Sequence, residues 1–221
     1  MDFSYTEQQK MIQQMVLDFT KKEIVPYYQQ WDEKQVFPSE LFKKAGKLGF
    51  MGVLVPEKYG GAGLPLRAAS VILEEIHRCG ANGAACHAQM YTMGTVLRHG
   101  SEEQKKEFLP KIADGTMRLQ AFGVTEPDAG TDTTSIRTRA ERDGDEYVIT
   151  GAKVWTTKAP YCDVCLLLVR TTPKELCDGP TQGMTLLLVD LKDPSVDITP
   201  IPKVGRNAVV SCEVRYDGLR V

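Results

Sequence analysis

The chain has 221 residues, with 27 basic and 29 acidic side chains and a net charge of −2 at pH 7. Hydrophobic residues make up 42% and charged residues 25%, the proportions of a globular protein rather than of a disordered one. No apolar run approaches the roughly 20 residues that a membrane-spanning helix needs. The near-neutral charge also argues against binding to nucleic acid, whose phosphates favour a basic face. One large or two small domains are expected.

Cysteine usage and the N-terminal segment point to a reducing compartment. The first residues lack the cationic start and apolar stretch of a secretory signal, and they are not Arg-rich like a transit peptide. The cysteines have no framework spacing for a chain of this length, so reduced thiols in a cytoplasmic protein are expected. The six residues are Cys79, Cys86, Cys162, Cys165, Cys177 and Cys212.

The first 120 residues are predicted to form a helical bundle. Ser4 and Glu7 have capping-box spacing, and the apolar residues that follow recur at helical intervals until Pro26, which ends or kinks the helix. Glycine and capping signals bound the other helices. These are expected from Pro38–Ser39 to Gly49, over 66–76, over 82–97, and from the second capping box at Ser101–Gln104 to about Gly115.

After Leu119 the pattern becomes that of strands. Asp143-Gly144 separates the alternating residues 136–140 from 147–149, which predicts a hairpin. Strands are also expected over 164–169, 184–189 and 211–216, the last followed by a turn at Asp217-Gly218. The fold class is therefore α+β, with a helical domain over 1–120 and an all-β, barrel-like or sandwich-like domain over 121–221. Because the chain stops at Val221 directly after a strand and turn, we expect a cut at a domain boundary there.

Several residues that could carry chemistry are better explained as structure. The sequence lacks the common phosphate-loop, zinc-protease and hydrolase motifs, and the glycines of 59–63 are expected to form a loop between helices. A single pair, Cys162 and Cys165, in a strand-like stretch lacks the further ligands of a zinc site. The remaining candidates have no ligand spacing and are interpreted as packing residues or as a solvated helix face. They are His77, His87, His99 and the pair Glu74-Glu75.

Two stretches remain as candidates for a ligand site. Residues 122–132 combine apolar side chains, hydroxyls and a Pro/Gly turn, and residues 151–157 place Trp155 beside two threonines. Taken singly, the first is equally well an ordinary turn between domains, and the second is more often a strand with a core tryptophan. Taken together, they describe an aromatic wall and a hydroxyl-bearing loop that could flank a flavin or another flat heterocycle.

These stretches resemble motifs of the acyl-CoA dehydrogenase family. Val124–Asp132 resembles the VTEPxAGSD signature, and Gly151–Thr157 is similar to the GxKxWIT segment that follows about two dozen residues later. Val55–Gly61 resembles the P-E-x-Y-G-G loop of the family, and residues 100–110 resemble its G-[ST]-xx-Q-K…LP helix. The four motifs occur in the family's order over nearly the whole chain.

The resemblance implies that FAD binds against the middle, β domain. By position, Phe122, Val124 and Thr125 would line the flavin, Gly130 would allow close approach of the backbone, and Thr131 would touch both FAD and acyl-CoA. Trp155, Thr156 and Thr157 would cover the other side of the ring system. Two positions depart from the family pattern, since Thr131 replaces the commoner Ser and Thr156 the commoner Ile. Neither change removes a hydrogen-bond donor.

The implied reaction removes the α proton of an acyl-CoA thioester and transfers the β hydrogen, as a hydride, to the flavin. In this family the base comes from a C-terminal helical domain, to which nothing here aligns, so no catalytic residue is nominated and the 221-residue chain alone is expected to be inactive. Helix residues Met90, Met93 and Gly94 are candidates for the pocket floor. Electron-transfer flavoprotein is the implied acceptor, and a homotetramer or homodimer the implied full-length assembly.

Two alternatives remain open at this stage. The first is a non-catalytic interaction or scaffold protein that kept the fold and lost turnover. The second is a relative that uses the same flavin site with oxygen, such as an acyl-CoA oxidase. The length and branching of the acyl group do not follow from the sequence.

Overall fold

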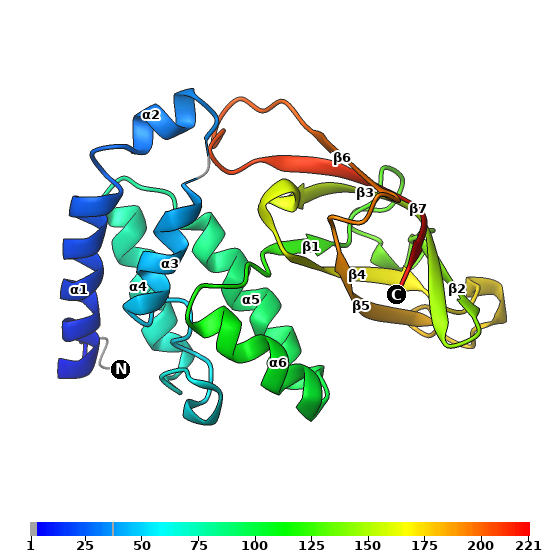
Figure 1. The fold of residues 1–221 in the computed structure, drawn as a ribbon, viewed down its shortest axis with the longest axis horizontal. Helices are drawn as coiled ribbons and strands as arrows, with labels where there is room; N and C mark the ends of the chain where they lie inside the picture. The colour runs from blue at the N-terminus through cyan, green and yellow to red at the C-terminus, as the bar shows by residue number, and fades with distance from the viewer. Residues whose placement is uncertain (1–3, 37) are drawn as a thin grey trace. The chain divides into compact units, whose positions relative to one another are not determined.

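A computed structural model describes residues 4–36 and 38–221 (Figure 1). The chain divides into two compact units. The helical unit contains the residues up to Arg118 together with Val204–Val209, and the β unit contains Leu119–Lys203 and Val210–Val221. The expected fold class, a helical region followed by a β domain, is confirmed. The return of residues 204–209 to the helical unit was not anticipated.

Six α-helices make up the described part of the helical unit, and α1 and α4 lie side by side in it (Figure 1). Five were expected; α2 was missed because Pro26 was interpreted only as a residue that ends or kinks the first helix. A short 3-10 helix, Glu57–Tyr59, occupies the predicted loop before α4. The helices are α1 (Glu7–Glu23), α2 (Tyr28–Glu33), α3 (Ser39–Lys47), α4 (Leu66–Arg78), α5 (Ala84–His99) and α6 (Glu102–Ala113).

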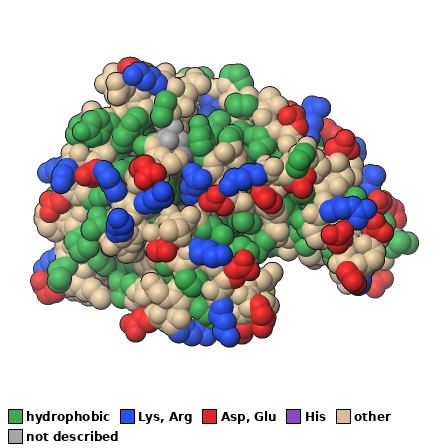
Figure 2. Space-filling model, viewed as in Figure 1, with side chains coloured by type: hydrophobic (Ala, Val, Ile, Leu, Met, Phe, Trp, Pro, Cys, Tyr) green, Lys and Arg blue, Asp and Glu red, His purple; other side chains and the backbone are tan. Residues whose placement is uncertain are grey.

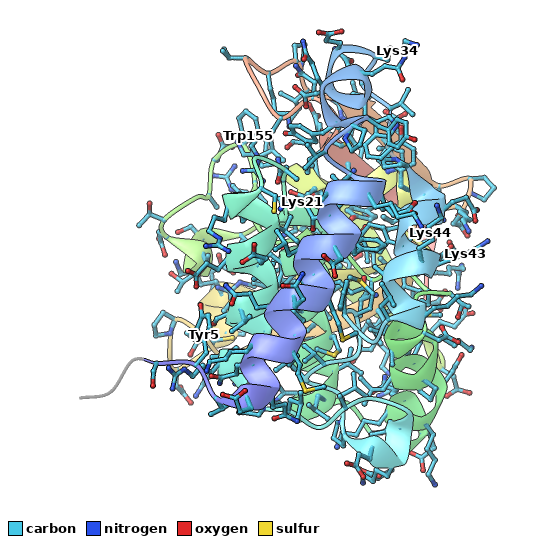
Figure 3. The ribbon with its side chains drawn as sticks, turned by 90° about the vertical axis from the view of Figure 1, so that its left-hand side faces the viewer. Tyr5, Lys21, Lys34, Lys43, Lys44 and Trp155 are labelled. Atoms are coloured by element: carbon cyan, nitrogen blue, oxygen red, sulfur yellow. The ribbon has the colours of Figure 1, made fainter. Side chains whose placement is uncertain are left out.

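The two predicted capping boxes have different outcomes. At α6 the Ser101 hydroxyl accepts from the Gln104 N–H, and the Gln104 side chain accepts from the Ser101 N–H, as expected. At α1 the box is formed by Thr6 and Gln9, so the expectation for Ser4 was wrong by two residues. The reason lies outside the helix, because Arg67 donates to the Ser4 carbonyl and the Tyr5 hydroxyl donates to Glu74 at 2.8 Å (Figure 3).

The helical unit has one apolar core, which α1, α3, α4 and α5 share. A second expectation was wrong here: only Glu74 is solvated, whereas the Glu75 side chain is 1% exposed. Its carboxylate pairs with Arg78 at 2.9 Å and accepts from Gln13 of α1 at 3.0 Å, which compensates its burial. No helix in the described part of the chain is long and apolar enough to cross a membrane.

The β unit is a seven-stranded sheet with the order β1-β4-β2-β3-β7-β6, and β5 pairs with β4. β1 is parallel to β4, while the long β3–β7 and β4–β5 pairs are antiparallel. Inward-facing side chains of these strands form the core of the unit. The strands are β1 (Ala121–Gly123), β2 (Arg139–Asp143), β3 (Glu146–Thr157), β4 (Val164–Arg170), β5 (Met184–Asp190), β6 (Val196–Pro200) and β7 (Ser211–Arg220).

The predicted strands are largely present. The β2–β3 hairpin turns at Asp143-Gly144, as expected, and Gly144 has φ of +64°. The turn expected at Asp217-Gly218 is wrong, because β7 continues through it to Arg220. Thr150 pairs with Asp217 and Ile149 with Leu219, so Gly218, with φ of +76°, is the extra residue of a β-bulge. β6 had no sequence signal and was missed.

The cysteines of the β unit are structural. Cys165 lies on β4, but Cys162 follows a 3-10 turn before the strand, so its expected place within a strand was wrong. Neither forms a disulfide and both are buried, and burial raises the pKa of the Cys165 thiol to about 12. No group of metal-ligand side chains occurs among the residues that the structure describes.

Candidate functional site

The structure brings the two candidate stretches together within the β unit. β1 ends at Gly123 and leads into the loop of residues 124–132, which runs beside β3. The Val154 N–H donates to the Thr125 carbonyl at 2.8 Å. Residues nearly thirty positions apart in the sequence are thus neighbours through a backbone hydrogen bond, and we call them together the two-loop site.

A buried ion pair reinforces this junction. The Lys153 ammonium group donates to the Glu126 carboxylate at 2.8 Å and to the Val124 carbonyl at 3.1 Å. The two side chains are 0% and 6% exposed. Glu126 also accepts from the backbone N–H groups of Arg137 and Thr138, at 2.6 and 2.9 Å. Both carboxylate oxygens of Glu126 thus have partners, and the Lys153 ammonium group has two acceptors, which compensates the burial of the pair.

The environment of the pair favours the ionised carboxylate. Burial opposes ionisation of Glu126, but the bonds from Lys153, Thr138 and Arg137 outweigh it and hold its pKa below the usual value. Burial lowers the pKa of Lys153, and the neighbouring Glu126 carboxylate counters that shift. The Lys153 side chain is bonded to a carboxylate and a carbonyl, and both contacts favour its protonated form.

Two local turns shape the rest of the loop. Glu126 and Ala129 exchange backbone hydrogen bonds of 3.0 and 3.2 Å, which closes a tight turn around Pro127 and Asp128. Asp132 then caps a short 3-10 helix by accepting from the Thr134 N–H at 3.0 Å. Glu126 is therefore held in its buried ion pair, and Asp132 serves as the cap of the 3-10 helix.

Trp155 sits on a bulge in β3 and faces outward. Lys153 pairs with Val214 and Thr156 with Cys212, so β3 has one residue more than β7 at this point. Trp155 has φ of +63° and is 55% exposed (Figure 3). The alternative interpretation as a core tryptophan is therefore wrong. A left-handed conformation costs a non-glycine residue about 1–2 kcal/mol, which marks this position as a candidate for function.

The other candidate residues differ in accessibility. Phe122, Val124, Thr125 and Thr157 are half-buried, and Gly130 and Thr131 are exposed. A Cβ placed on Gly130 would meet nothing within 4 Å, so the backbone there faces open space. Thr156 is fully buried, and its hydroxyl is bonded to no described residue.

Two glycines allow the close approach of the strands under the site. A Cβ on Gly123 would lie 2.8 Å from a Leu167 methyl carbon and 3.3 Å from Cγ of Lys153. A Cβ on Gly151 would lie 2.7 Å from the Thr138 backbone, and Gly151 has φ of +150°. Gly123 was not identified from the sequence as important, because nothing local to a strand end predicts which side chain passes over it.

Arg170 and Lys158 were also missed. Arg170 at the end of β4 is 6% exposed and donates to the carbonyls of Thr134, Pro180 and Gln182, which ties loop 171–183 to the 3-10 helix after the two-loop site. Lys158, directly after β3, is fully buried with φ of +63°. Burial lowers the pKa of Lys158 to about 6. Neither position carries a recognisable motif.

Other candidates of the helical unit do not form a site of their own. Met90 and Met93 are buried in α5, and a Cβ on Gly94 would meet nothing. The histidines lie on α4 and α5, as expected, and lack a metal-binding arrangement within the described ranges. Positive and negative side chains alternate over the face shown in Figure 2.

Comparison with known proteins supplies a family context for this geometry. The model of the acyl-CoA dehydrogenase N-terminal domain matches residues 6–116, and the model of the middle domain matches residues 121–219. A probable acyl-CoA dehydrogenase of Bacillus subtilis, YngJ, is 38% identical over 224 residues, which cover all of this chain and 58% of that protein.

Solved structures agree with this comparison. A glutaryl-CoA dehydrogenase in complex with glutaryl-CoA superimposes with a TM-score of 0.90 at 32% identity, over 100% of this chain and 56% of that one. A glutaryl-CoA dehydrogenase from Mycobacterium smegmatis in complex with FADH2 gives 0.83 at 29% identity, over 98% and 54%. The chain thus spans somewhat more than half the length of the proteins it matches.

Proposed function

The chain belongs to the acyl-CoA dehydrogenase family, through its N-terminal and middle domains, and from this we propose that the whole protein oxidises an acyl-CoA thioester between its α and β carbons with FAD. The observation that carries the proposal is the junction of the two loops. The Thr125–Val154 hydrogen bond and the Lys153–Glu126 pair hold both family motifs at one place in the β unit.

The residues at this junction fit a flat, polar heterocycle. Trp155 offers an exposed indole on a strained backbone, an arrangement suited to stacking. The hydroxyls of Thr125 and Thr131 are bonded to no other described residue, and Gly130 leaves open space. We assign Phe122, Val124, Thr125, Gly130 and Thr131 to one side of the flavin. Trp155, Thr156 and Thr157 are assigned to the other, with Thr156 contributing its backbone because its side chain is buried.

The cofactor and the residues of this chain are proposed to have different roles in the reaction. When bound, FAD accepts the β hydrogen as a hydride. This chain holds the cofactor and, through Thr131, orients the thioester, while the three carboxylates of the loop have other roles. Glu126 is paired, Asp132 is a cap, and Asp128 is exposed beside Arg137, at 3.7 Å. From the family resemblance, the base that removes the α proton is proposed to lie outside residues 1–221, and the chain alone is proposed to be inactive.

The remaining parts of the proposal concern partners and location. Acyl-CoA is the proposed substrate, electron-transfer flavoprotein the proposed acceptor and a homo-oligomer, tetramer or dimer, the proposed assembly of the whole protein. A cytoplasmic location is proposed from the cysteines, none of which forms a disulfide in the described residues. These expectations come from the family and the sequence motifs.

The test begins with the visible absorption spectrum of the purified 221-residue chain before and after incubation with FAD. A flavin band near one per chain supports the proposed cofactor site. A folded chain that takes up no FAD under any loading condition contradicts the assignment of these loops as sufficient for binding. Oxidation of an acyl-CoA by this chain with an artificial electron acceptor would refute its proposed inactivity.

The same measurements separate the alternative functions. A scaffold protein would stay colourless and would show no acyl-CoA-dependent bleaching even in the whole protein. An acyl-CoA oxidase would release hydrogen peroxide directly in air, whereas a dehydrogenase would reduce an added electron-transfer flavoprotein.

A further inference from the structure

The ammonium group of Lys153 has a second acceptor besides its carboxylate partner. It donates to the Val124 carbonyl at 3.1 Å as well as to Glu126 at 2.8 Å. Glu126 alone would anchor the loop, because it also accepts from the backbone N–H groups of the two residues that precede β2. The carbonyl bond, by contrast, depends on Lys153 only. It fixes the direction of one particular peptide group.

The direction of the Val124 carbonyl sets the direction of the Thr125 N–H. The chain has no cis peptide among its described residues, so the Val124 carbonyl and the Thr125 N–H point in opposite directions across one planar peptide. With the carbonyl turned towards Lys153, the Thr125 N–H points to the opposite side of the loop. No described residue accepts a hydrogen bond from this N–H. The Thr125 carbonyl, in turn, is held by Val154 at 2.8 Å.

We propose that Lys153 is a positioning residue, which orients the Thr125 N–H as a hydrogen-bond donor for the cofactor by holding the Val124 carbonyl on the opposite side. The inference rests on the proposed function, because it assumes that the ligand of this face is FAD. Lys153 itself does not touch the ligand, since its side chain is fully buried. Glu126 keeps Lys153 charged and in place.

The space for this arrangement is built into the strand below. The stem of Lys153 passes within contact distance of Gly123, where a Cβ would lie 3.3 Å from Cγ of the lysine. Glycine at the end of β1 therefore admits the lysine stem next to the peptide that it orients. A long side chain with a terminal donor is needed to reach the Val124 carbonyl from β3, and a neutral apolar side chain of equal length would leave that carbonyl unpaired.

The main test uses a variant that separates positioning from folding. Lys153→Met alone would leave the Glu126 carboxylate buried without its cation, which is strongly destabilising. The double variant Lys153→Met/Glu126→Gln removes both charges and keeps the volumes, a change that is often close to neutral for stability. We expect this variant to melt near the wild-type temperature and to bind FAD at least tenfold more weakly.

A matched control removes a cation from β7, the strand that pairs with β3. Arg220 on β7 forms exposed ion pairs with Asp143 and Glu146, at 2.7 and 3.0 Å. Arg220→Met is expected to keep the wild-type affinity for FAD. A second measurement needs no cofactor: in the FAD-free chain, the double variant should shift the Thr125 amide resonance. The amides of the β3–β7 pairing should stay protected.

The outcomes separate this inference from the proposed function. Wild-type affinity in the double variant overturns the positioning role, and so does an equal loss in Arg220→Met. If the wild-type chain takes up no FAD, the cofactor assignment fails. The Thr125 amide resonance of the FAD-free double variant then tests whether Lys153 orients this peptide group. An unchanged Thr125 amide in the double variant overturns the inference in that case too.

Discussion

Lys158 gives the sharpest prediction about stability. The residue is fully buried directly after β3, and burial lowers its pKa from the ordinary 10.5 to about 6. Of the neighbouring groups, Cys162 raises this pKa and Lys203 lowers it further, but burial is the largest influence. At neutral pH the folded chain therefore carries a neutral amine at this position, whereas the unfolded chain carries an ammonium group.

The sign of the pH dependence follows from proton linkage. Between pH 6 and 10.5 the unfolded chain binds one proton more than the folded chain at this site, so the free energy of unfolding rises with pH. The slope is about 1.4 kcal/mol per pH unit for one proton. From pH 6.5 to 8 the contribution of Lys158 should grow by about 2 kcal/mol. Below pH 6 both states are protonated and the dependence disappears.

The assay compares the wild-type chain with Lys158→Met, which keeps the length of the side chain and removes the titrating group. Urea unfolding is followed at half-unit steps from pH 6 to 8 through the fluorescence of Trp155, in a Trp31→Phe background that removes the tryptophan of the helical unit. The variant should be more stable at every pH. Its advantage should be largest at pH 6 and shrink by about 1.4 kcal/mol per unit.

A control and a refuting result complete the design. Lys192→Met removes an exposed lysine of the same unit, which pairs with Asp163 at 3.0 Å. Its difference from wild type should stay constant over this pH range. A constant difference for Lys158→Met, or one that grows with pH, would show that the amine is charged in the folded chain and that the argument from burial is wrong.

Three further substitutions test individual contacts. Gly123→Ala places a methyl group 2.8 Å from a Leu167 side-chain carbon and should lower the free energy of unfolding in urea by about 1–3 kcal/mol. The same variant should also bind FAD more weakly. Arg170→Met leaves three backbone carbonyls without their donor; a loss of about 2–4 kcal/mol and faster amide exchange over 171–183 are expected. Ser101→Ala removes the cap of α6 and should lower the stability of the helical unit by about 1 kcal/mol, measured by circular dichroism, with FAD affinity unchanged.

The fold could be predicted as far as its signals are local. Helical periodicity, the cap at Ser101 and the Asp143-Gly144 hairpin depend on neighbouring residues, and the structure confirms them. The failures involve partners far along the chain. Gly218 became a bulge because β3 continues opposite it, and the start of α1 was fixed by contacts from α4. A local pattern cannot report such partners.

The candidate site shows the same contrast between local sequence signals and partners far along the chain. The motif residues were found because family motifs are contiguous, and the structure places both stretches side by side. Three residues that support these stretches were not identified as such, because their roles depend on burial and on partners ten or more residues away. They are Glu126, Lys153 and Arg170. The only indication in the sequence was a lysine at an inward-facing position of a strand. That position can be identified only when the inward face of the strand is known.

Departures from ordinary local preferences gather around this site. Two non-glycine residues with positive φ, Trp155 and Lys158, lie within four positions of each other, and the buried charge of Lys153 lies two positions before the first. Each is unfavourable alone, by about 1–3 kcal/mol for a strained backbone. Such costs persist in a folded chain where the surroundings enforce them, and they concentrate where a ligand is held. The bulge leaves the Trp155 indole exposed, while the buried pair fixes the loop that is bonded to β3 at Val154. The strain and the charge therefore serve one arrangement, which is the reason to test Lys153 through cofactor affinity and not through stability alone.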